Sequence, residues 1–82
     1  MIDQRAKDLS LLLILLTGWE EERRNGAPGE KIFRAWKGYS YEIMDSLQKD
    51  KLIYQPMKAK SLILTEDGRK RAEELRGRLM RA

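Results

Sequence analysis

Residues 41–68, YEIMDSLQKDKLIYQPMKAKSLILTEDG, constrain the fold more than any other part of this chain. A short amphipathic pattern leads into two apolar segments with a proline and two lysines between them, and then into a pattern that opens a helix. This order predicts a short helix, a strand, a turn, a second strand and the start of a last helix. The expected fold class is therefore α+β.

The short helix is predicted over residues 41–50, with Ser40 as its N-cap, because a serine hydroxyl can accept a free amide proton of the first turn. Its inward stripe is apolar, whereas its outward side mixes acidic, basic and neutral polar residues. The inward residues are Ile43, Met44 and Leu47, and the outward ones are Glu42, Asp45, Ser46, Gln48 and Lys49.

Two strands and a last helix are predicted to follow. Residues 52–55 form the first strand, which Pro56 ends, and residues 57–60 form the turn. Residues 61–65 form the second strand. Thr65 is also the expected N-cap of the last helix. The narrow apolar stripe of that helix consists of Ala72, Leu75 and Leu79.

The N-terminal segment predicts a long helix from Asp3 or Gln4 to about Arg24, with a stop at Asn25-Gly26. Its middle is apolar nearly all round, although a helix on the surface of an 82-residue monomer has one side to bury. We therefore expect a homodimer in which this helix packs against its symmetry mate. In the alternative, the sheet and the last helix cover both faces within one chain. One apolar face consists of Leu9, Leu12, Leu13, Leu16 and Trp19, and the residues assigned to the dimer interface are Leu11, Ile14, Leu15 and Trp19.

The segment between this helix and Ser40 lacks a convincing amphipathic helix. Residues 25–31, NGAPGEK, predict a loop whose glycine spacing does not match a nucleotide-binding motif. Residues 32–38, IFRAWKG, predict a short edge strand or an extended connector. Two interpretations of Trp36 and Tyr39 stay open: they form an exposed contact patch, or they cover the core beside the following helix.

Composition excludes most enzyme chemistry. The 82 residues are expected to form one domain, residues 1–82, and they contain no cysteine and no histidine. Without these side chains the usual zinc sites, thiolate nucleophiles and imidazole bases are missing, so we expect no enzyme, no metal and no cofactor. The consecutive carboxylates Glu20, Glu21 and Glu22 would point in different directions on a helix. The apolar run of residues 9–16 is too short to span a bilayer, so the expected location is the cytoplasm, without a membrane partner.

Two resemblances rest on the second half of the chain. Residues 43–75, and above all the step Leu64-Thr65-Glu66-Asp67-Gly68, resemble the recognition helix, wing and closing helix of MarR-like and PadR-like winged-helix repressors. The resemblance implies a small winged-helix-like domain: a long N-terminal helix, a short helix, a two- or three-stranded antiparallel wing sheet and a C-terminal helix. The segments RAWKG, KAKS and LTEDG together are similar to a family of small uncharacterised bacterial proteins, which has no activity to carry over.

Charge and resemblance together favour binding to double-stranded DNA in transcription regulation. Residues 31–82 contain thirteen Lys or Arg and seven Asp or Glu, which permits phosphate contacts. Acidic residues on the helix of residues 41–50 argue against tight base reading. The alternative is therefore a protein-interaction or dimerisation module that keeps the winged-helix architecture without binding DNA. The candidate nucleic-acid-binding residues are Lys37, Ser46, Gln48, Lys49, Lys51, Lys58, Lys60 and Arg69.

Overall fold

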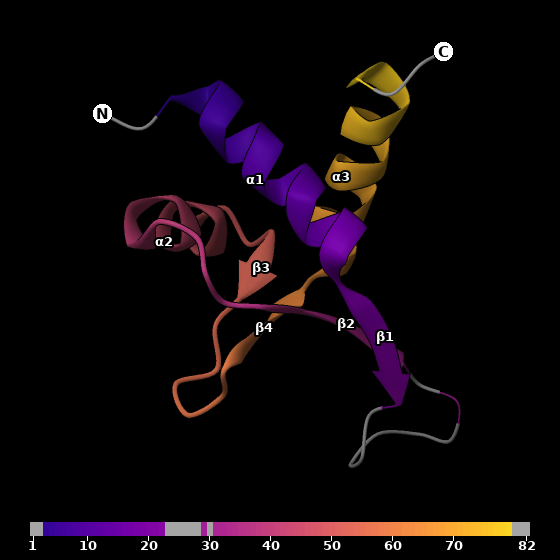
Figure 1. The fold of residues 1–82 in the computed structure, drawn as a ribbon. Coiled ribbons are helices and arrows are strands. Elements are labelled where there is room, and N and C mark those ends of the chain that lie inside the picture. Colours follow the sequence, from indigo (N-terminus) through magenta and orange to yellow (C-terminus); the bar gives the residue numbers. More distant parts are fainter. Residues whose placement is uncertain (1–2, 23–28, 30, 80–82) are drawn as a thin grey trace.

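The structure is a computed structural model, which describes residues 3–22, 29 and 31–79. In these residues, three helices and four strands follow one another (Figure 1). This confirms the α+β class, and the arrangement is consistent with a small winged-helix-like domain. The elements are α1 (Gln4–Thr17), β1 (Trp19–Glu22), β2 (Lys31–Trp36), α2 (Tyr41–Lys49), β3 (Ile53–Tyr54), β4 (Ser61–Leu64) and α3 (Glu66–Leu79).

The four strands form one antiparallel sheet in the order β1-β2-β4-β3. The segment IFRAWKG, which the sequence assigned to an edge or a connector, is instead the central strand β2, paired with β1 on one side and with β4 on the other. The sheet therefore has one strand more than the two or three expected. The additional strand is β1, in a segment that the sequence predicts to be helical.

The first helix is shorter than the sequence predicts, because it ends at Thr17 and not near Arg24. Asp3 caps its start by accepting the Arg5 amide proton at 2.8 Å. Gly18 follows, and the chain there runs so close to β2 that a Cβ atom would lie 2.2 Å from the Phe33 ring. Pairing with β2 outweighs the helix propensity of the WEEE segment. The predicted stop at Asn25-Gly26 lies outside the described residues, as does most of the loop predicted over residues 25–31.

All three helices contribute to one core, which lies on a single face of the sheet. The strand residues that enter this core alternate along the chain, as side chains of a β-strand do. None of the helices in the described residues has the length and the apolar character needed to cross a bilayer. The core residues are Leu11, Ile14, Leu15, Ala35, Met44, Leu47, Ile53, Leu62, Leu64, Ala72 and Leu75, with Phe33, Tyr39, Ile43 and Leu52 packed against them.

The junction between β4 and α3 is built on Thr65 and Gly68. The Thr65 hydroxyl accepts the Gly68 amide proton at 3.0 Å, as expected of an N-cap, and it lies 2.9 Å from the Leu52 carbonyl oxygen, to which it can donate. Gly68 lies against the same backbone, where a Cβ atom would come within 1.9 Å of the Leu52 oxygen. The LTEDG segment therefore has a structural explanation, since threonine caps the helix and glycine permits its close approach to the chain before β3.

Candidate nucleic-acid interface

Three of the predicted lysines meet at the turn between β3 and β4. Lys58 and Lys60 are exposed on this turn, and Lys37 joins it from the end of β2. The Lys37 amide donates to the Lys60 carbonyl at 3.1 Å, which extends the pairing of β2 with β4, and the Lys37 ammonium donates to the Pro56 carbonyl at 2.8 Å. We call Lys37 and residues 56–60 the basic turn. An ammonium carries three protons, so one bond to Pro56 leaves Lys37 able to contact an anion.

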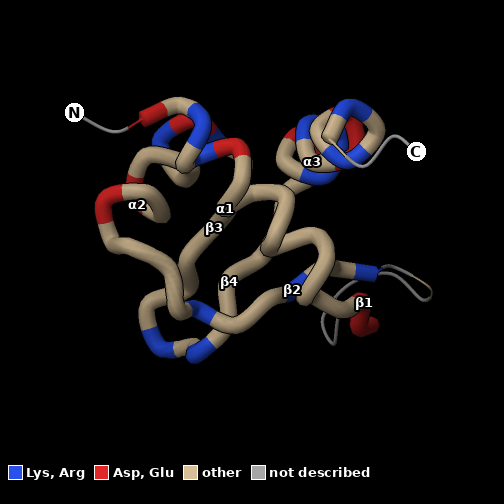
Figure 2. The backbone as a smooth tube through the Cα atoms, turned by 45° about the horizontal axis from the view of Figure 1, so that its top comes forward, with Lys and Arg blue, Asp and Glu red and all other residues tan. Residues whose placement is uncertain are grey.

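The strands around the basic turn carry no acidic residue. Residues 31–41 and 51–65, which contain β2, β3 and β4, hold six Lys or Arg and no Asp or Glu. Figure 2 shows the blue segments at the turn, with the red segments on the helices and on β1. Cations without nearby carboxylates attract phosphate more strongly than mixed surfaces do. Counting charges over the whole second half of the sequence hides this separation, because the acidic residues of α2 and α3 cancel part of it.

The outward side of α2, which the sequence predicts to face DNA bases, is largely occupied by hydrogen bonds to Gln55, the residue after β3. The Gln55 amide donates to Gln48 Oε1 at 2.7 Å, and the Gln55 side chain donates to Asp45 Oδ1 at 3.2 Å. Ser46 is half-buried, and Glu42 is exposed on the same short helix. The N-cap position of Ser40 is confirmed, although its side chain makes no capping hydrogen bond. Through these contacts α2 supports the β3–β4 hairpin. The exposed surface of α2 carries charges of both signs.

Lys49 and Lys51 lie at the C-terminal end of α2, away from the basic turn. The amide protons of Lys51 and Leu52 close this end on the carbonyls of Gln48 and Leu47, at 2.9 and 3.0 Å. This C-cap requires a left-handed residue after Asp50, and Lys51 occupies that position with φ of 63°. The Lys51 carbonyl faces the Thr65 hydroxyl at 2.8 Å. The structure thus places Lys51 beside the start of α3, at the opposite end of the hairpin from Lys58.

Arg69 is held by β1 and β2 and does not join the basic turn. Its guanidinium donates to Glu20 Oε1 at 2.6 Å and lies 5.4 Å from the centre of the Phe33 ring. This hydrogen bond, followed by the charge of Arg69, lowers the pKa of the Glu20 carboxyl below its ordinary value.

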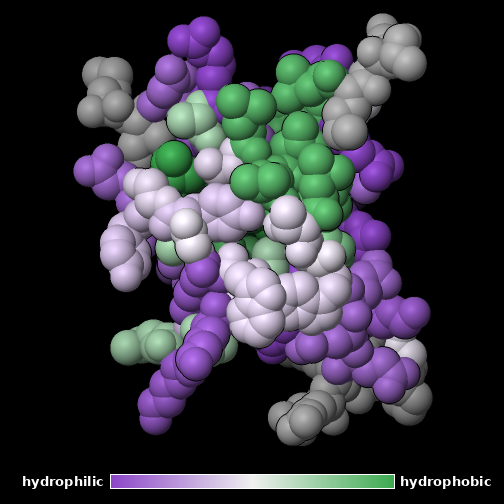
Figure 3. All heavy atoms as spheres, viewed as in Figure 1, coloured by the Kyte–Doolittle hydropathy of each residue, from purple (hydrophilic) through white to green (hydrophobic). Residues whose placement is uncertain are grey.

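The residues assigned to a dimer interface occupy other environments. Leu11, Ile14 and Leu15 are buried inside the single chain, as in the alternative that the sequence left open. Trp19 lies in β1, on the face of the sheet opposite the helices, and not on α1. The leucines that α1 leaves exposed belong to the other predicted face. They are Leu9, Leu13 and Leu16, with exposed fractions of 57%, 47% and 48%. Figure 3 shows a green, hydrophobic surface over α1 and α3.

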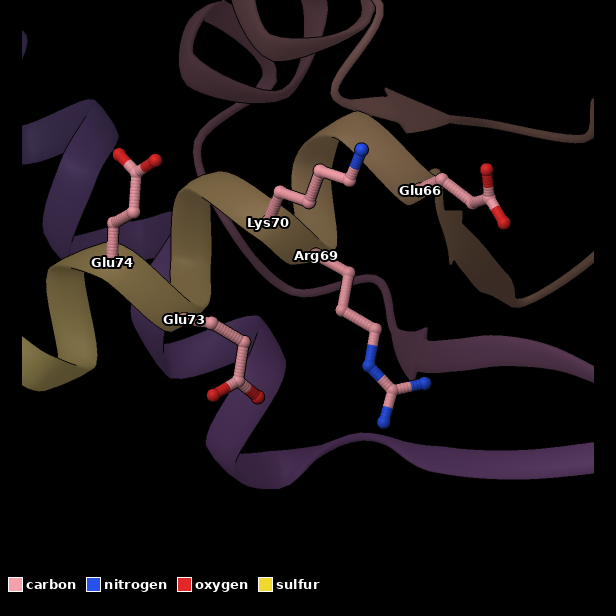
Figure 4. Close-up of a pocket in the computed structure, with 5 residues that line it drawn as sticks. All are labelled: Glu66, Arg69, Lys70, Glu73 and Glu74. Carbon is pink, nitrogen blue, oxygen red and sulfur yellow. The ribbon is translucent and has the colours of Figure 1, made fainter.

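A shallow depression beside α3 offers no comparable site. Glu66, Arg69, Lys70, Glu73 and Glu74 line it, and Figure 4 shows these side chains spreading away from one another. Arg69 is engaged by Glu20, while Glu73 pairs with Arg76 at 2.9 Å. The mixture of signs gives this surface no preference for an anion or a cation.

The structure gives a different answer for each of Trp36 and Tyr39: the first is exposed and the second covers the core. Trp36 is 63% exposed on the outer face of β2, where its ring centre lies 4.9 Å from that of Trp19. Tyr39 instead packs against the core. Strand alternation is the signal that distinguishes Trp36 from its buried neighbour Ala35, and it is visible once residues 31–36 are recognised as a strand.

These features define a small α+β domain with a basic β-turn, braced by a short helix. The chain belongs to the family described as a domain of unknown function, DUF6429, which matches residues 2–82. The uncharacterized protein y4hR of Sinorhizobium fredii (strain NGR234) is 48% identical over 46 residues, which cover 55% of this chain and 62% of the relative. The match thus leaves more than a third of that relative uncovered. No solved structure matches the chain.

Proposed function

We propose that this protein binds double-stranded DNA in the cytoplasm, as a regulator-like protein, through the phosphate contacts of its basic turn. The observation that carries the proposal is the meeting of Lys37, Lys58 and Lys60 at one turn, in segments that contain β2, β3 and β4 and hold no acidic residue. Lys37, Lys58 and Lys60 supply the contacts because the half-buried Lys37 lies against the turn on which Lys58 and Lys60 are exposed. A narrow turn that presents ammonium groups can contact the phosphates beside a groove without reading bases.

Sequence preference should be weak. The side chains of Gln48 and Asp45, which would face a major groove, are hydrogen-bonded to Gln55, and Glu42 would approach phosphates with the same sign of charge. Ser46 and Lys49 remain as the residues of α2 able to contact base edges. Binding dominated by phosphates has dissociation constants of about 10⁻⁴–10⁻⁶ M at physiological salt and depends steeply on salt.

A fluorescence-polarisation titration tests this proposal. Labelled duplexes of two unrelated sequences should bind with similar micromolar affinity at about 50 mM salt and more weakly at about 150 mM. Loss of polarisation change at both salt concentrations would contradict DNA binding. A large preference for one duplex would contradict the weak role assigned to α2.

A second candidate function, homodimerisation, is favoured by the exposed leucines of α1. Leu9, Leu13 and Leu16 follow the i, i+4, i+7 spacing of one helical face, and Leu79 of α3 is 56% exposed. This stripe is self-complementary: in an antiparallel pair of α1 helices, Leu9 of one copy meets Leu16 of the other, and Leu13 lies next to the two-fold axis. A second copy of this chain is therefore the proposed partner.

Sedimentation velocity at about 100 µM tests the dimer. The wild-type chain should sediment as a dimer, and Leu13→Lys should sediment as a monomer because it places two charges at the two-fold axis. Tyr41→Lys changes an aromatic residue that is 81% exposed on α2 and should leave the dimer intact. A wild-type monomer would refute this interface. A dimer that fails to bind DNA would favour the interaction module without DNA binding.

A further inference from the structure

The face of the sheet opposite the three helices, which we call the open face, is unusually rich in apolar side chains. An antiparallel sheet with one face toward solvent normally carries polar residues there. Here five of the eight outward side chains are aromatic or aliphatic, so this face has the composition of a contact surface. The open face consists of Trp19, Glu21, Ile32, Arg34, Trp36, Tyr54, Ser61 and Ile63.

Strand register aligns the open face into a row across the whole sheet. Trp19 pairs with Arg34, Arg34 with Ile63, and Ile63 with Tyr54. The charge of Arg34 is satisfied within the open face, because its guanidinium forms an ion pair with Glu21 and donates to the Ser61 hydroxyl at 3.0 Å. The centre of the open face is thus close to neutral and is fixed by its own contacts.

The two exposed aromatic residues of this face remain accessible, and one of them, Trp36, is supported by a neighbouring ring. Trp36 is 63% exposed and Tyr54 is 54% exposed. The Trp19 ring lies against Trp36 with a tilt of 49° between the ring planes, and the Trp19 indole donates to Glu21 at 3.2 Å. A supported aromatic ring loses little conformational freedom when a flat ligand stacks on it. Such rings suit nucleobases, because every base has a π face.

Two lysines lie at the end of the sheet that carries Trp36 and Ser61. Lys37 follows Trp36 in the chain, and Lys60 precedes Ser61, the residue paired with Trp36 on β4. The backbone hydrogen bond from Lys37 to Lys60 therefore joins the basic turn to the end of the open face. A ligand that covers both surfaces must combine negative charge with flat apolar groups. A nucleic acid strand with unpaired bases has this combination, whereas the bases of a duplex are already stacked on one another.

We propose that the open face stacks the unpaired bases of single-stranded nucleic acid on Trp36 and Tyr54, while Lys37, Lys58 and Lys60 contact its phosphates. This inference rests on the proposed function, because the same lysines serve both. It goes further by naming the form of nucleic acid that the protein prefers: a strand that is single or locally opened.

The test compares a labelled oligothymidylate of about 12 nucleotides with a duplex of 12 base pairs, at equal salt. Trp36→Ala and Tyr54→Ala should each weaken binding of the single strand by about 5- to 150-fold, the equivalent of ~1–3 kcal/mol per stacked base, and leave duplex binding unchanged. Trp36→Phe should retain most of the affinity, which separates loss of stacking from loss of folding. Tyr41→Ala removes an aromatic residue outside the open face and should alter neither affinity. Tryptophan fluorescence should be quenched by the single strand, because both tryptophans lie on this face.

The outcomes separate this inference from the function on which it rests. Duplex binding that depends on Lys58 and Lys60, together with a single-strand affinity indifferent to Trp36→Ala and Tyr54→Ala, would overturn the stacking surface and leave the proposed function standing. Binding of neither nucleic acid would overturn both. Equal losses for single strand and duplex in folded Trp36→Ala would also contradict stacking of unpaired bases.

Discussion

The Cα atom of Gly68 packs so closely on the backbone of Leu52 that a Cβ atom at this position would lie 1.9 Å from the Leu52 carbonyl oxygen. The same oxygen is 3.1 Å from the Thr65 amide nitrogen, which donates to it. The first turn of α3 and the segment between α2 and β3 are thereby locked together. This contact fixes the base of the hairpin that presents the basic turn.

Gly68→Ala should therefore destabilise the protein by about 1–3 kcal/mol or more, because backbone has to move to accommodate the methyl group. Gly77 lies on the same helix and serves as the matched control. Apart from the neighbouring backbone of that helix, no atom lies within 4 Å of a Cβ atom placed there. Gly77→Ala should stabilise the protein by about 0.5–1 kcal/mol, because alanine has the higher helix propensity. Urea denaturation measures both changes. Equal effects of the two substitutions would contradict the close packing at Gly68.

Lys51→Gly should raise the free energy of unfolding. Lys51 adopts φ of 63° in the C-cap of α2, and a left-handed conformation costs a residue with a Cβ atom about 1–2 kcal/mol, which the added flexibility of glycine in the unfolded chain partly offsets. Lys51→Ala removes the same charge but keeps the strain, so it should change stability little. Thermal unfolding of the two variants provides the comparison. If alanine stabilised as much as glycine, loss of charge would be the cause and backbone strain would be excluded.

The ion pair between Glu20 and Arg69 predicts a pH dependence with a definite sign. The pKa of Glu20 is lowered in the folded chain, first by the hydrogen bond from Arg69 and then by its charge. The ion pair therefore stabilises the folded chain fully above 4.5, the ordinary pKa of the carboxyl. This stabilisation disappears as the pH falls through the lowered pKa of Glu20 in the folded chain. Titration by NMR should show that Arg69→Met raises the pKa of Glu20. Arg76→Met removes an arginine that pairs with Glu73 and should leave the Glu20 titration unchanged.

The second half of the fold could be predicted from the sequence because its signals are local. Pro56 marks the turn, alternation defines the apolar strands, and Thr65 with Gly68 marks the start of α3. The elements after Ser40 accordingly lie within about two residues of their predicted bounds. β1 could not be predicted in the same way. Trp19–Glu22 has the composition of a helix, and its strand conformation depends on pairing with β2, which begins only at Lys31.

In the candidate site, too, the sequence identifies residues whose role depends on their own segment and misses those whose role depends on a distant partner. Lys58 and Lys60 can be recognised from the sequence because they occupy a predicted turn. The roles of Gln48 and Arg69 could not be deduced from their own segments, since each is set by a partner distant in the sequence: Gln55 for the first, and Glu20 with Phe33 for the second. Pairing of distant strands also created the open face.

The most direct test of the basic turn is the salt dependence of duplex affinity. Three phosphate contacts predict a slope of log K against log salt of roughly −2.7, and Lys58→Ala with Lys60→Ala should make it shallower by about 1.8. The matched control, Lys70→Ala with Arg78→Ala, removes two exposed charges from α3 and should keep the wild-type slope. A large difference between the two double variants is the result we expect. Equal slopes for both would show that net charge, and not the basic turn, governs binding.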